Sequence, residues 1–193
     1  MIMHEKTDLS GSFIMAPVPV VLVACAHEEL GRNLLTIAWT GIDCSDPATV
    51  HVSIRPERHS YRMIAESGCF TVNIPTVDMA ATVDLCGLIS GSEFSGSEED
   101  KFDVAGLTAA PAKEIQAPLV AECPINLECR VTNIIPVGVH HMFIGEVVAR
   151  HADSEVLTDG KLDFSKIPLI TYVNGEYWSL GKPVGRYGYS KKG

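Results

Sequence analysis

Three arginines lie within eight positions of one another, between an expected strand and an expected helix. Arg55, Arg58 and Arg62 belong to a chain of 193 residues that has 15 lysines and arginines and a formal net charge of -9. His59 and Ser60 follow Arg58 directly. A guanidinium group can bind two phosphate oxygens at once, and the first turn of a helix offers unpaired N–H groups to an anion. The cluster predicts an anion site; the alternative is a solvated turn whose arginines pair with nearby acids.

The elements on either side of this turn should hold it in place. Residues 50–54 alternate apolar and polar side chains, which is typical of a half-buried strand, and Pro56 has no N–H to continue the ladder. We expect Ser60 to cap the following helix and Gly68 to end it in a left-handed conformation. The basic residues then sit where a strand ends and a helix begins.

Composition bounds the class of protein. The chain is 46% hydrophobic and 20% charged, and its pI is near 5.2, so we expect a globular protein that binds neither nucleic acid nor an anionic membrane. We predict one domain over residues 1–193, with residues 1–13 and 182–193 as peripheral arms. The N-terminus lacks a signal-peptide pattern, and no apolar run reaches the roughly 20 residues of a membrane span, which favours a cytoplasmic location. The six cysteines include no Cys-x-x-Cys pair, which favours reduced thiols.

A first hairpin is expected before the basic turn. Residues 17–26 form a β-branched run suited to a buried strand, a polar turn follows, and residues 34–39 re-enter a strand. Alternation places Thr36 and Ala38 on one face of that strand and Trp39 on the other, with Leu35 and Ile37. The face with the small residues could hold a flat ligand; the alternative is an ordinary strand with a core tryptophan.

Two loops carry residues of uncertain role. Residues 41–47 are rich in turn formers and predict a loop that contains Cys44, either a redox thiol or an ordinary exposed cysteine. Residues 88–103 are rich in glycine, serine and acid, which predicts a lid or mobile excursion. Lys101 is the cation of that segment, and it could reach an anion or pair with Asp100.

The remaining pattern is mostly β. A strand is expected at residues 69–74, and then a helix that Thr76 caps and that ends at Cys86 before Gly87. Residues 125–134 and 141–150 predict a long hairpin, and strands outnumber helices without regular alternation. This favours an antiparallel barrel or sandwich. The adjacent His140 and His141 should point to opposite faces, so we expect a surface or capping role for at least one of them and no metal pair. An aromatic, glycine-rich tail suits subunit contacts, the cover of a planar ligand or plain terminal packing.

Several of these stretches, in the same order, resemble the flavin reductase-like domain family and within it its flavoredoxin-type members. The likeness covers roughly residues 14–181. The stretches that carry it are Pro19-Val20-Val21-Leu22-Val23, Asn33-Leu34-Leu35-Thr36-Ile37-Ala38-Trp39, Val52-Ser53-Ile54-Arg55-Pro56-Glu57-Arg58-His59-Ser60-Tyr61, Phe70-Thr71-Val72-Asn73-Ile74-Pro75, Asp100-Lys101-Phe102, Gly106-Leu107-Thr108 and Phe143-Ile144-Gly145-Glu146-Val147.

The resemblance implies a mainly β fold with flanking helices, an FMN-binding split β-barrel of Greek-key topology. It also implies a homodimer with flavin at the subunit boundary. In such proteins the phosphate is held by the basic turn, and the ring lies along the strand that ends in Trp39. The implied cofactor-binding residues are Arg58, His59 and Ser60 for the phosphate, Ser53 and Ile54 along the site, Asn33, Thr36, Ala38 and Trp39 beside the ribityl chain and ring, and Lys101 for phosphate or a partner.

The implied activity is FMN-dependent oxidoreduction. Electrons would pass from NAD(P)H or a redox partner through FMN to a small-molecule or protein acceptor, and the flavin's own chemistry requires no catalytic acid, base or nucleophile from the protein. The sequence has no Gly-x-Gly-x-x-Gly fingerprint, so use of NAD(P)H depends on the resemblance alone. The first alternative is an FMN-binding electron carrier or sensor without turnover. The second is a structural barrel with an incidental basic turn.

Overall fold

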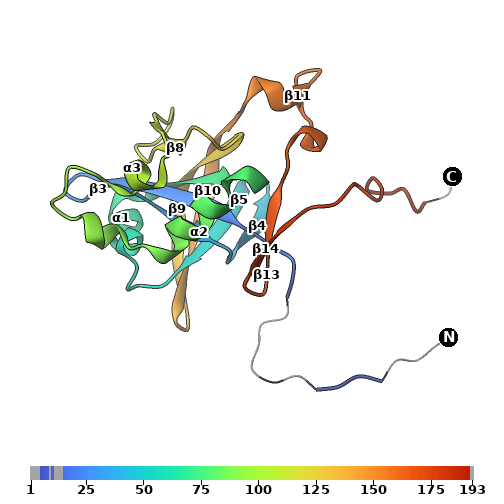
Figure 1. Ribbon diagram of the computed structural model, residues 1–193, viewed down its shortest axis with the longest axis horizontal. Coiled ribbons are helices and arrows are strands. Elements are labelled where there is room, and N and C mark those ends of the chain that lie inside the picture. Colours follow the sequence, from blue (N-terminus) through green and yellow to red (C-terminus); the bar gives the residue numbers. More distant parts are fainter. Residues whose placement is uncertain (1–4, 9, 11–14, 192–193) are drawn as a thin grey trace.

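The computed structural model describes residues 5–8, 10 and 15–191 (Figure 1). The predicted arms at 1–13 and 182–193 therefore lie partly outside the described residues. Within those residues the main feature is a seven-stranded sheet in which every neighbouring pair is antiparallel. Its strands, in order across the sheet, are β3 (Gly31–Ile37), β2 (Val21–His27), β6 (Cys69–Ile74), β9 (Ile125–Val137), β10 (His140–Ala152), β5 (Ala48–Ile54) and β4 (Thr40–Ser45).

The order of the strands requires the sheet to curl. β3 and β4 lie at opposite edges, yet only Ala38 and Trp39 join them along the chain. Two residues cannot cross an open seven-stranded sheet, since neighbouring strands are about 4.8 Å apart. The edges must therefore meet at Ala38 and Trp39. Beside this junction the Ser53 N–H of β5 donates to the carbonyl of Trp39 at 2.9 Å, which continues the pairing of β4 with β5. The result is a barrel.

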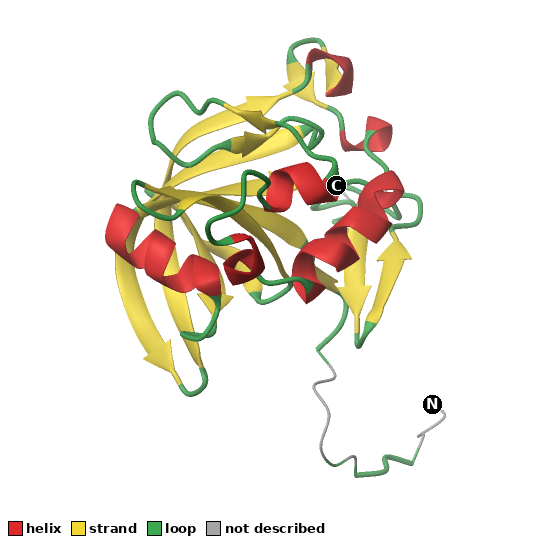
Figure 2. Cartoon of the chain, turned by 60° about the vertical axis from the view of Figure 1, so that its left-hand side comes forward, coloured by secondary structure: helices red, strands yellow, loops and turns green. Residues whose placement is uncertain are grey.

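Side chains inside the barrel form one core, and a second core lies outside it. β2 contributes to both, because Val21, Val23 and Cys25 point inward while Leu22 and Ala24 point outward. This explains its unbroken apolar run. The inner core is closed by Met63 and Ile64 of α1 (His59–Ser67), and the outer core by Val83 and Cys86 of α2 (Ala80–Leu88) and Phe102 of α3 (Lys101–Ala105). Figure 2 shows these helices against the curled sheet.

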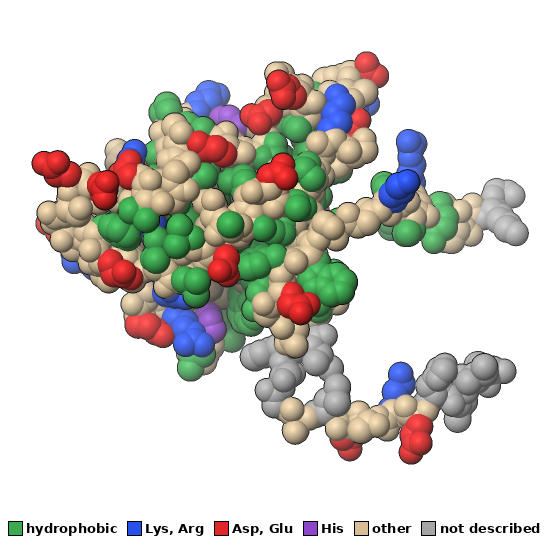
Figure 3. All heavy atoms as spheres, viewed as in Figure 1, with side chains coloured by type: hydrophobic (Ala, Val, Ile, Leu, Met, Phe, Trp, Pro, Cys, Tyr) green, Lys and Arg blue, Asp and Glu red, His purple; other side chains and the backbone are tan. Residues whose placement is uncertain are grey.

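Smaller elements complete the fold. β1 (Val18–Pro19), β13 (Ile170–Val173) and β14 (Glu176–Ser179) form a three-stranded sheet; β7 (Ala109–Ala110) pairs with β8 (Leu119–Val120), and β11 (Leu157–Thr158) with β12 (Lys161–Leu162). Short 3-10 helices are η1 (Val77–Met79), η2 (Gly91–Phe94), η3 (Ser154–Val156) and η4 (Phe164–Lys166). After β14 the chain leaves the body as an extended arm, with acidic side chains scattered over the face beside it (Figure 3). None of the helices in the described residues is long and apolar enough to cross a membrane.

Three local predictions were wrong. Residues 41–47 are not a loop, because β4 occupies Thr40–Ser45 as an edge strand with an irregularity between Ile42 and Cys44, where turn-forming residues are tolerated. The helix after Thr76 begins as 3-10 helix η1, and Thr76 makes no side-chain cap. α2 then continues through Gly87, which packs against Thr36. The two hairpins, the strand at residues 69–74 and the left-handed Gly68 after α1 are confirmed.

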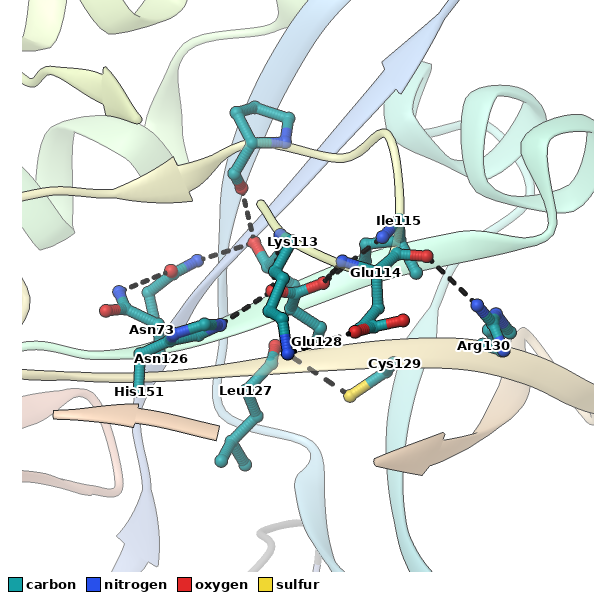
Figure 4. Close-up of polar contacts among 12 residues, drawn as sticks. Asn73, Lys113, Glu114, Ile115, Asn126, Leu127, Glu128, Cys129, Arg130 and His151 are labelled. Atoms are coloured by element: carbon teal, nitrogen blue, oxygen red, sulfur yellow. Dashed lines mark hydrogen bonds and ion pairs between the residues drawn. The ribbon is translucent and has the colours of Figure 1, made fainter. Parts of the chain in front are cut away.

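A buried carboxylate joins the barrel wall to the loop that follows β7. The Glu128 side chain of β9 is fully buried and accepts backbone N–H groups from Lys113 at 2.8 Å, Glu114 at 2.7 Å and Ile115 at 3.2 Å (Figure 4). His151 of β10 lies 2.6 Å from the same carboxylate. Burial alone would raise the pKa of Glu128, but these hydrogen bonds outweigh it and lower the pKa overall. An ionised Glu128 thus holds the loop on the barrel.

Candidate functional site

The basic turn leads directly into α1, although not with the cap that the sequence suggested. Arg58 occupies the N-cap position with an extended backbone and makes no side-chain cap, and α1 begins at His59. Ser60 lies inside the first turn and is almost fully buried. Its hydroxyl accepts a hydrogen bond from Asn33 Nδ2 at 2.7 Å. The prediction of Ser60 as the cap was wrong, because its hydroxyl is turned inward to the β3 amide; the helix N-terminus nevertheless lies where it was expected.

Two cations meet at the carboxyl end of α2. Arg58 Nη1 donates to the Gly87 carbonyl at 3.3 Å. Lys101, buried to 2% exposure, donates from Nζ to the carbonyls of Cys86 at 2.7 Å and Ile89 at 2.8 Å. Positive charge at this end of a helix is favourable, since the last carbonyls carry partial negative charge. The chain has therefore brought cations from two distant segments to one place.

The other arginines of the cluster behave as the alternative expected. Arg55 pairs with Glu57 at 3.7 Å, and Arg62 pairs with Glu66 at 2.7 Å, all with well-exposed side chains. Exposed pairs of this kind contribute little to stability. Of the three arginines, Arg58 is the one placed at the N-terminus of α1 and beside α2.

A cavity of about 350 Å³ opens beside these groups, between the turn before β3, the start of α1 and the segment 91–101. Its walls include Arg32, Asn33, His59, Gly91 and Lys101. Charge varies with depth: Lys101 is buried, while the carboxylates among the lining residues belong to the exposed Glu29, Glu98 and Glu99 and to the half-buried Asp100. The inner end is thus the cationic one.

One buried atom in this cavity wall lacks a partner. Asn33 Oδ1 receives no hydrogen bond from any described residue, although Asn33 is 3% exposed. Gly91 approaches the same amide so closely that a Cβ at residue 91 would lie 2.6 Å from Oδ1. Buried polar atoms are nearly always hydrogen-bonded, and an exception calls for an explanation. A ligand hydroxyl donating to Asn33 Oδ1 would satisfy it.

Burial changes the pKa values of two ionisable groups in this cavity. Burial lowers the pKa of Lys101 to about 8, and the charge of Arg58 also opposes its protonation. Burial likewise lowers the pKa of His59, with a smaller contribution from Lys101. Lys101 does not pair with Asp100, which instead binds Arg32 and caps α3 by accepting the backbone N–H groups of Phe102 and Asp103. Lys101 therefore remains available to an anion, because Nζ has a third N–H to donate.

A second, larger cleft of about 830 Å³ begins at the far end of β3. Ala38 and Trp39 both line it, since the chain bends between β3 and β4 and the strict alternation of faces ends at Ile37. Both residues thus border one cleft, although the alternation predicted opposite faces for them. The other lining residues are Met15, Pro17, Val18, Pro19, Thr40, Gly41, His51, Ser53, Tyr172 and Asn174.

Aromatic rings surround Trp39. His140 of β10 stacks on it with ring centroids 6.5 Å apart and planes 25° apart, and Tyr172 of β13 meets it edge-on at 6.4 Å. The next residue, His141, points elsewhere and lies 2.7 Å from the Tyr61 hydroxyl. The two histidines thus point to different sides, and His140 is the one beside the cleft. A planar ligand would meet an aromatic wall here.

The other residues that the sequence singled out differ in how they face the two cavities. Ser53 lines the cleft, whereas the side chain of Ile54 is buried in the inner core, so only the backbone of Ile54 is free to face a ligand. Thr36 lies between the two cavities along β3, and its hydroxyl donates to the Val83 carbonyl of α2. Cys44 is exposed on β4 and donates to the Asp46 carbonyl at 3.3 Å. Together, Asn33, Thr36, Ala38 and Trp39 form a line from the cationic cavity to the aromatic cleft.

Sequence reasoning missed other residues of the cleft. Tyr172 and Asn174 come from a tail that was noted only for its aromatic content. His51 was assigned to the polar face of its strand, and Asp43 to a loop, yet their side chains meet at 2.6 Å. The sequence did show that His51 lies on the polar face of an alternating strand, which could have marked it as a candidate site residue. Its partner Asp43 could not be predicted while residues 41–47 were expected to form a loop.

A model of the flavin reductase like domain matches residues 15–181. Among solved structures, the chain resembles flavoredoxin of Desulfovibrio vulgaris (Miyazaki F), with 31% identity, a TM-score of 0.88, and coverage of 97% of this chain and 100% of that one. Flavoredoxin from Methanosarcina acetivorans is similar at 27% identity and a TM-score of 0.87, with 97% of each chain covered.

A curated relative carries a name that describes an activity. The ferric-chelate reductase (NAD(P)H) of Archaeoglobus fulgidus is 28% identical over 166 residues, which cover 83% of this chain and 86% of that protein. With these likenesses, the predicted mainly β split barrel with flanking helices is confirmed, and so is the resemblance on which it was based.

Proposed function

Because the chain belongs to the flavin reductase-like domain family, we propose that it is an FMN-binding oxidoreductase. Electrons pass from NAD(P)H or a redox partner through bound FMN to a small-molecule or protein acceptor. A flavin-related redox role follows from the family and its flavoredoxin relatives. The choice of FMN, the electron donor and the residues that bind the cofactor are parts of the proposal.

One observation carries the choice of cofactor. The cationic cavity at Asn33 and the aromatic cleft at Trp39 lie at the two ends of one stretch of chain. Ala38 is five positions beyond Asn33, which corresponds to about 17 Å of extended strand. A mononucleotide with a phosphate at one end and a flat ring at the other matches this arrangement.

The residues present suit each part of FMN. The N–H groups at the start of α1, with Arg58, His59 and Lys101, supply donors and positive charge for the 5′-phosphate. Asn33 Oδ1 offers a buried acceptor to a ribityl hydroxyl, and Thr36 lies farther along the same path. Ala38, Trp39 and Ser53 would flank the ring. Bound flavin supplies the redox chemistry, and the protein positions it and excludes water from the buried end.

The proposed electron donor comes from the relatives. The name of the Archaeoglobus relative includes NAD(P)H, which favours a pyridine nucleotide as donor for this chain too. The alternative is an FMN-binding electron carrier or sensor without NAD(P)H turnover, which the likeness to flavoredoxins supports.

Two measurements test these proposals. The purified chain, loaded with FMN and freed of excess, is expected to retain a flavin absorption band; a chain that binds no FMN refutes both the enzyme and the carrier. Anaerobic addition of NADH or NADPH to the loaded protein then separates the two. Bleaching of the flavin band supports the oxidoreductase, and an unchanged band supports the carrier.

We also propose that the chain is a single domain that acts as a homodimer in the cytoplasm. The β9–β10 hairpin ends in exposed apolar residues, with Val137 at 56% and Val139 at 69% exposure, and such a patch suits burial against a second copy. The six cysteines are all free thiols, which agrees with a reducing compartment. Light scattering after size-exclusion chromatography should give twice the mass of the 20.8 kDa chain. A mass of one chain across working concentrations contradicts the dimer.

A further inference from the structure

A histidine and a carboxylate form a pair in the wall of the aromatic cleft. His51 Nδ1 of β5 lies 2.6 Å from Asp43 Oδ1 of β4, and the two side chains keep 25% and 29% of their surface exposed. The pair exists because β4 is irregular between Ile42 and Cys44, where Asp43 lies beside the neighbouring strand. Gly41 faces His51 in the register, and a Cβ at residue 41 would lie 3.1 Å from the ring.

This contact fixes the orientation of the imidazole ring and the nitrogen that faces Asp43. A carboxylate beside Nδ1 accepts the proton of that nitrogen, which orients the ring. Nε2 is then the nitrogen left to give or take a proton. The arrangement is that of an oriented general acid or base, with Asp43 in the positioning role.

The pair lies where such a group could serve a redox reaction. His51 lines the same cleft as Ala38, Trp39 and Ser53, the residues proposed to flank the ring. On the same face of the sheet, the other described titratable side chains include Cys44 of β4 and Glu146 of β10, both opposite Thr49 in the register. His140 of β10 lies on this face too, two residues before Met142, and stacks on Trp39. Residue Ile144, opposite His51 on β10, is apolar. Asp43 is thus the charged partner in contact with His51.

We propose that His51 is the proton donor for the electron acceptor of this enzyme, and that the acceptor is a planar quinone. The inference rests on the proposed function, which supplies reduced FMN as the reductant. The quinone gains a hydride equivalent, that is two electrons and one proton, from the reduced flavin, which becomes oxidised. His51 Nε2 gives the second proton to the resulting hydroquinone anion. The products are hydroquinone and neutral His51, which takes a new proton from water.

The class of acceptor follows from the need for this proton. A ferric chelate accepts one electron and needs no proton, so a positioned acid has no use in its reduction. A quinone oxygen must be protonated, and the aromatic cleft suits a flat molecule. The presence of an oriented acid beside the proposed ring site therefore favours the quinone.

The test compares two acceptors on one variant. His51→Gln is loaded with FMN and reduced, then mixed in stopped flow with benzoquinone or with ferricyanide, which takes electrons without protons. We expect reoxidation by benzoquinone to slow at least about 100-fold and reoxidation by ferricyanide to stay unchanged. His27→Gln is the matched control, because His27 Nε2 also lies 2.8 Å from a carboxylate, that of Glu66, but outside the cleft. It should react with both acceptors as the wild type does.

The positioning role of Asp43 has its own readouts. In Asp43→Asn, reoxidation by benzoquinone should slow while reoxidation by ferricyanide stays unchanged, because the imidazole ring is no longer held in one orientation. Nitrogen NMR of the chain without flavin should show the Nδ1–H form of His51 in the wild type and a mixture of tautomers in Asp43→Asn. A purely structural pair would leave the ratio of the benzoquinone rate to the ferricyanide rate unchanged in Asp43→Asn.

The outcomes are separable from those of the proposed function. A wild-type chain that binds no FMN overturns the proposed function and this inference together. If loaded His51→Gln reduces benzoquinone within about threefold of the wild type, this inference alone is overturned. Equal slowing with ferricyanide also overturns it, since that result means a disturbed flavin site.

Discussion

Replacing Glu128 by glutamine should destabilise the barrel without changing its volume. Glu128 Oε1 faces the Lys113 N–H at 2.8 Å and His151 Nε2 at 2.6 Å, while Oε2 faces the N–H groups of Glu114 at 2.7 Å and Ile115 at 3.2 Å. Glutamine keeps one oxygen and replaces the other by an NH₂ donor. Whichever way the amide turns, at least one buried backbone N–H then faces a donor.

The magnitude follows from counting these contacts. The better orientation turns NH₂ toward His151, whose Nε2 can serve as an acceptor, and leaves the Lys113 N–H unpaired. An unsatisfied buried donor costs about 1–3 kcal/mol, and the hydrogen bonds that remain lose the strengthening that a charged acceptor gives. We expect a total of about 2–4 kcal/mol, which for a domain of this size is a fall in Tm of roughly 5–15 °C.

Urea unfolding at pH 7 and at pH 4, at one protein concentration, measures this effect. The folded pKa of Glu128 is lowered, so its contribution is present above the unfolded value near 4.3 and is lost as pH falls through the folded pKa. The gap between wild type and Glu128→Gln should therefore narrow at acid pH. Glu122→Gln is the control, because Glu122 also accepts a backbone N–H, that of Thr108, but at an exposed site.

The reasoning fails if Glu128→Gln unfolds within about 0.5 kcal/mol of the wild type at pH 7. It fails equally if the exposed Glu122→Gln costs as much. Either result would mean that burial of the carboxylate adds nothing to the hydrogen bonds it accepts.

Three further predictions concern the cofactor site. Arg58→Ala should weaken FMN binding about 10- to 150-fold by fluorescence titration and leave riboflavin, which has no phosphate, unchanged; equal losses for both would remove the phosphate role. FMN affinity should fall about tenfold per pH unit above about 8, where Lys101 loses its proton, with no such trend for riboflavin or in Lys101→Met. Gly91→Ala should cost about 1–3 kcal/mol in stability and weaken FMN binding, because its Cβ would lie 2.6 Å from Asn33 Oδ1. Gly181→Ala, with open space around it, should do neither.

Periodicity was sufficient for most of the barrel. The alternation in residues 50–54 and 125–134 marked strands that the structure confirms. In β5 it follows burial, since Val50, Val52 and Ile54 are buried and the residues between them are half-buried, whereas in β9 the polar Asn126 and Glu128 are buried as well. It failed at β4, whose glycine, aspartate and serine are typical of turns. An edge strand tolerates such residues, since it is paired on one side only. β4 is a strand because it pairs with β5, and the residues of β4 by themselves do not reveal that pairing.

The candidate site was predictable only where its residues are neighbours in the sequence. Arg58 and His59 are neighbours in sequence and lie at the expected helix start, so local reasoning reached them. Asp43 and His51 lie on two neighbouring strands, β4 and β5. Lys101 and the carbonyls at the end of α2 belong to two different helices that pack on the outer core. Whether a polar side chain faces solvent or a cavity depends on what the rest of the chain packs beside it. That information is not local.

The two carbonyls that accept hydrogen bonds from Lys101 fix this side chain before any ligand binds. In the folded chain the ammonium group already has partners, so the cavity needs no counter-ion from solution to keep that charge in place. Arrival of a phosphate then adds a partner to a side chain that is already immobile. The rotamer entropy of this lysine, up to about 2 kcal/mol, is spent when the protein folds and not when the ligand binds. A site built in this way should discriminate between ligands by fit more than by net charge, because its principal cation cannot move to meet a poorly placed anion.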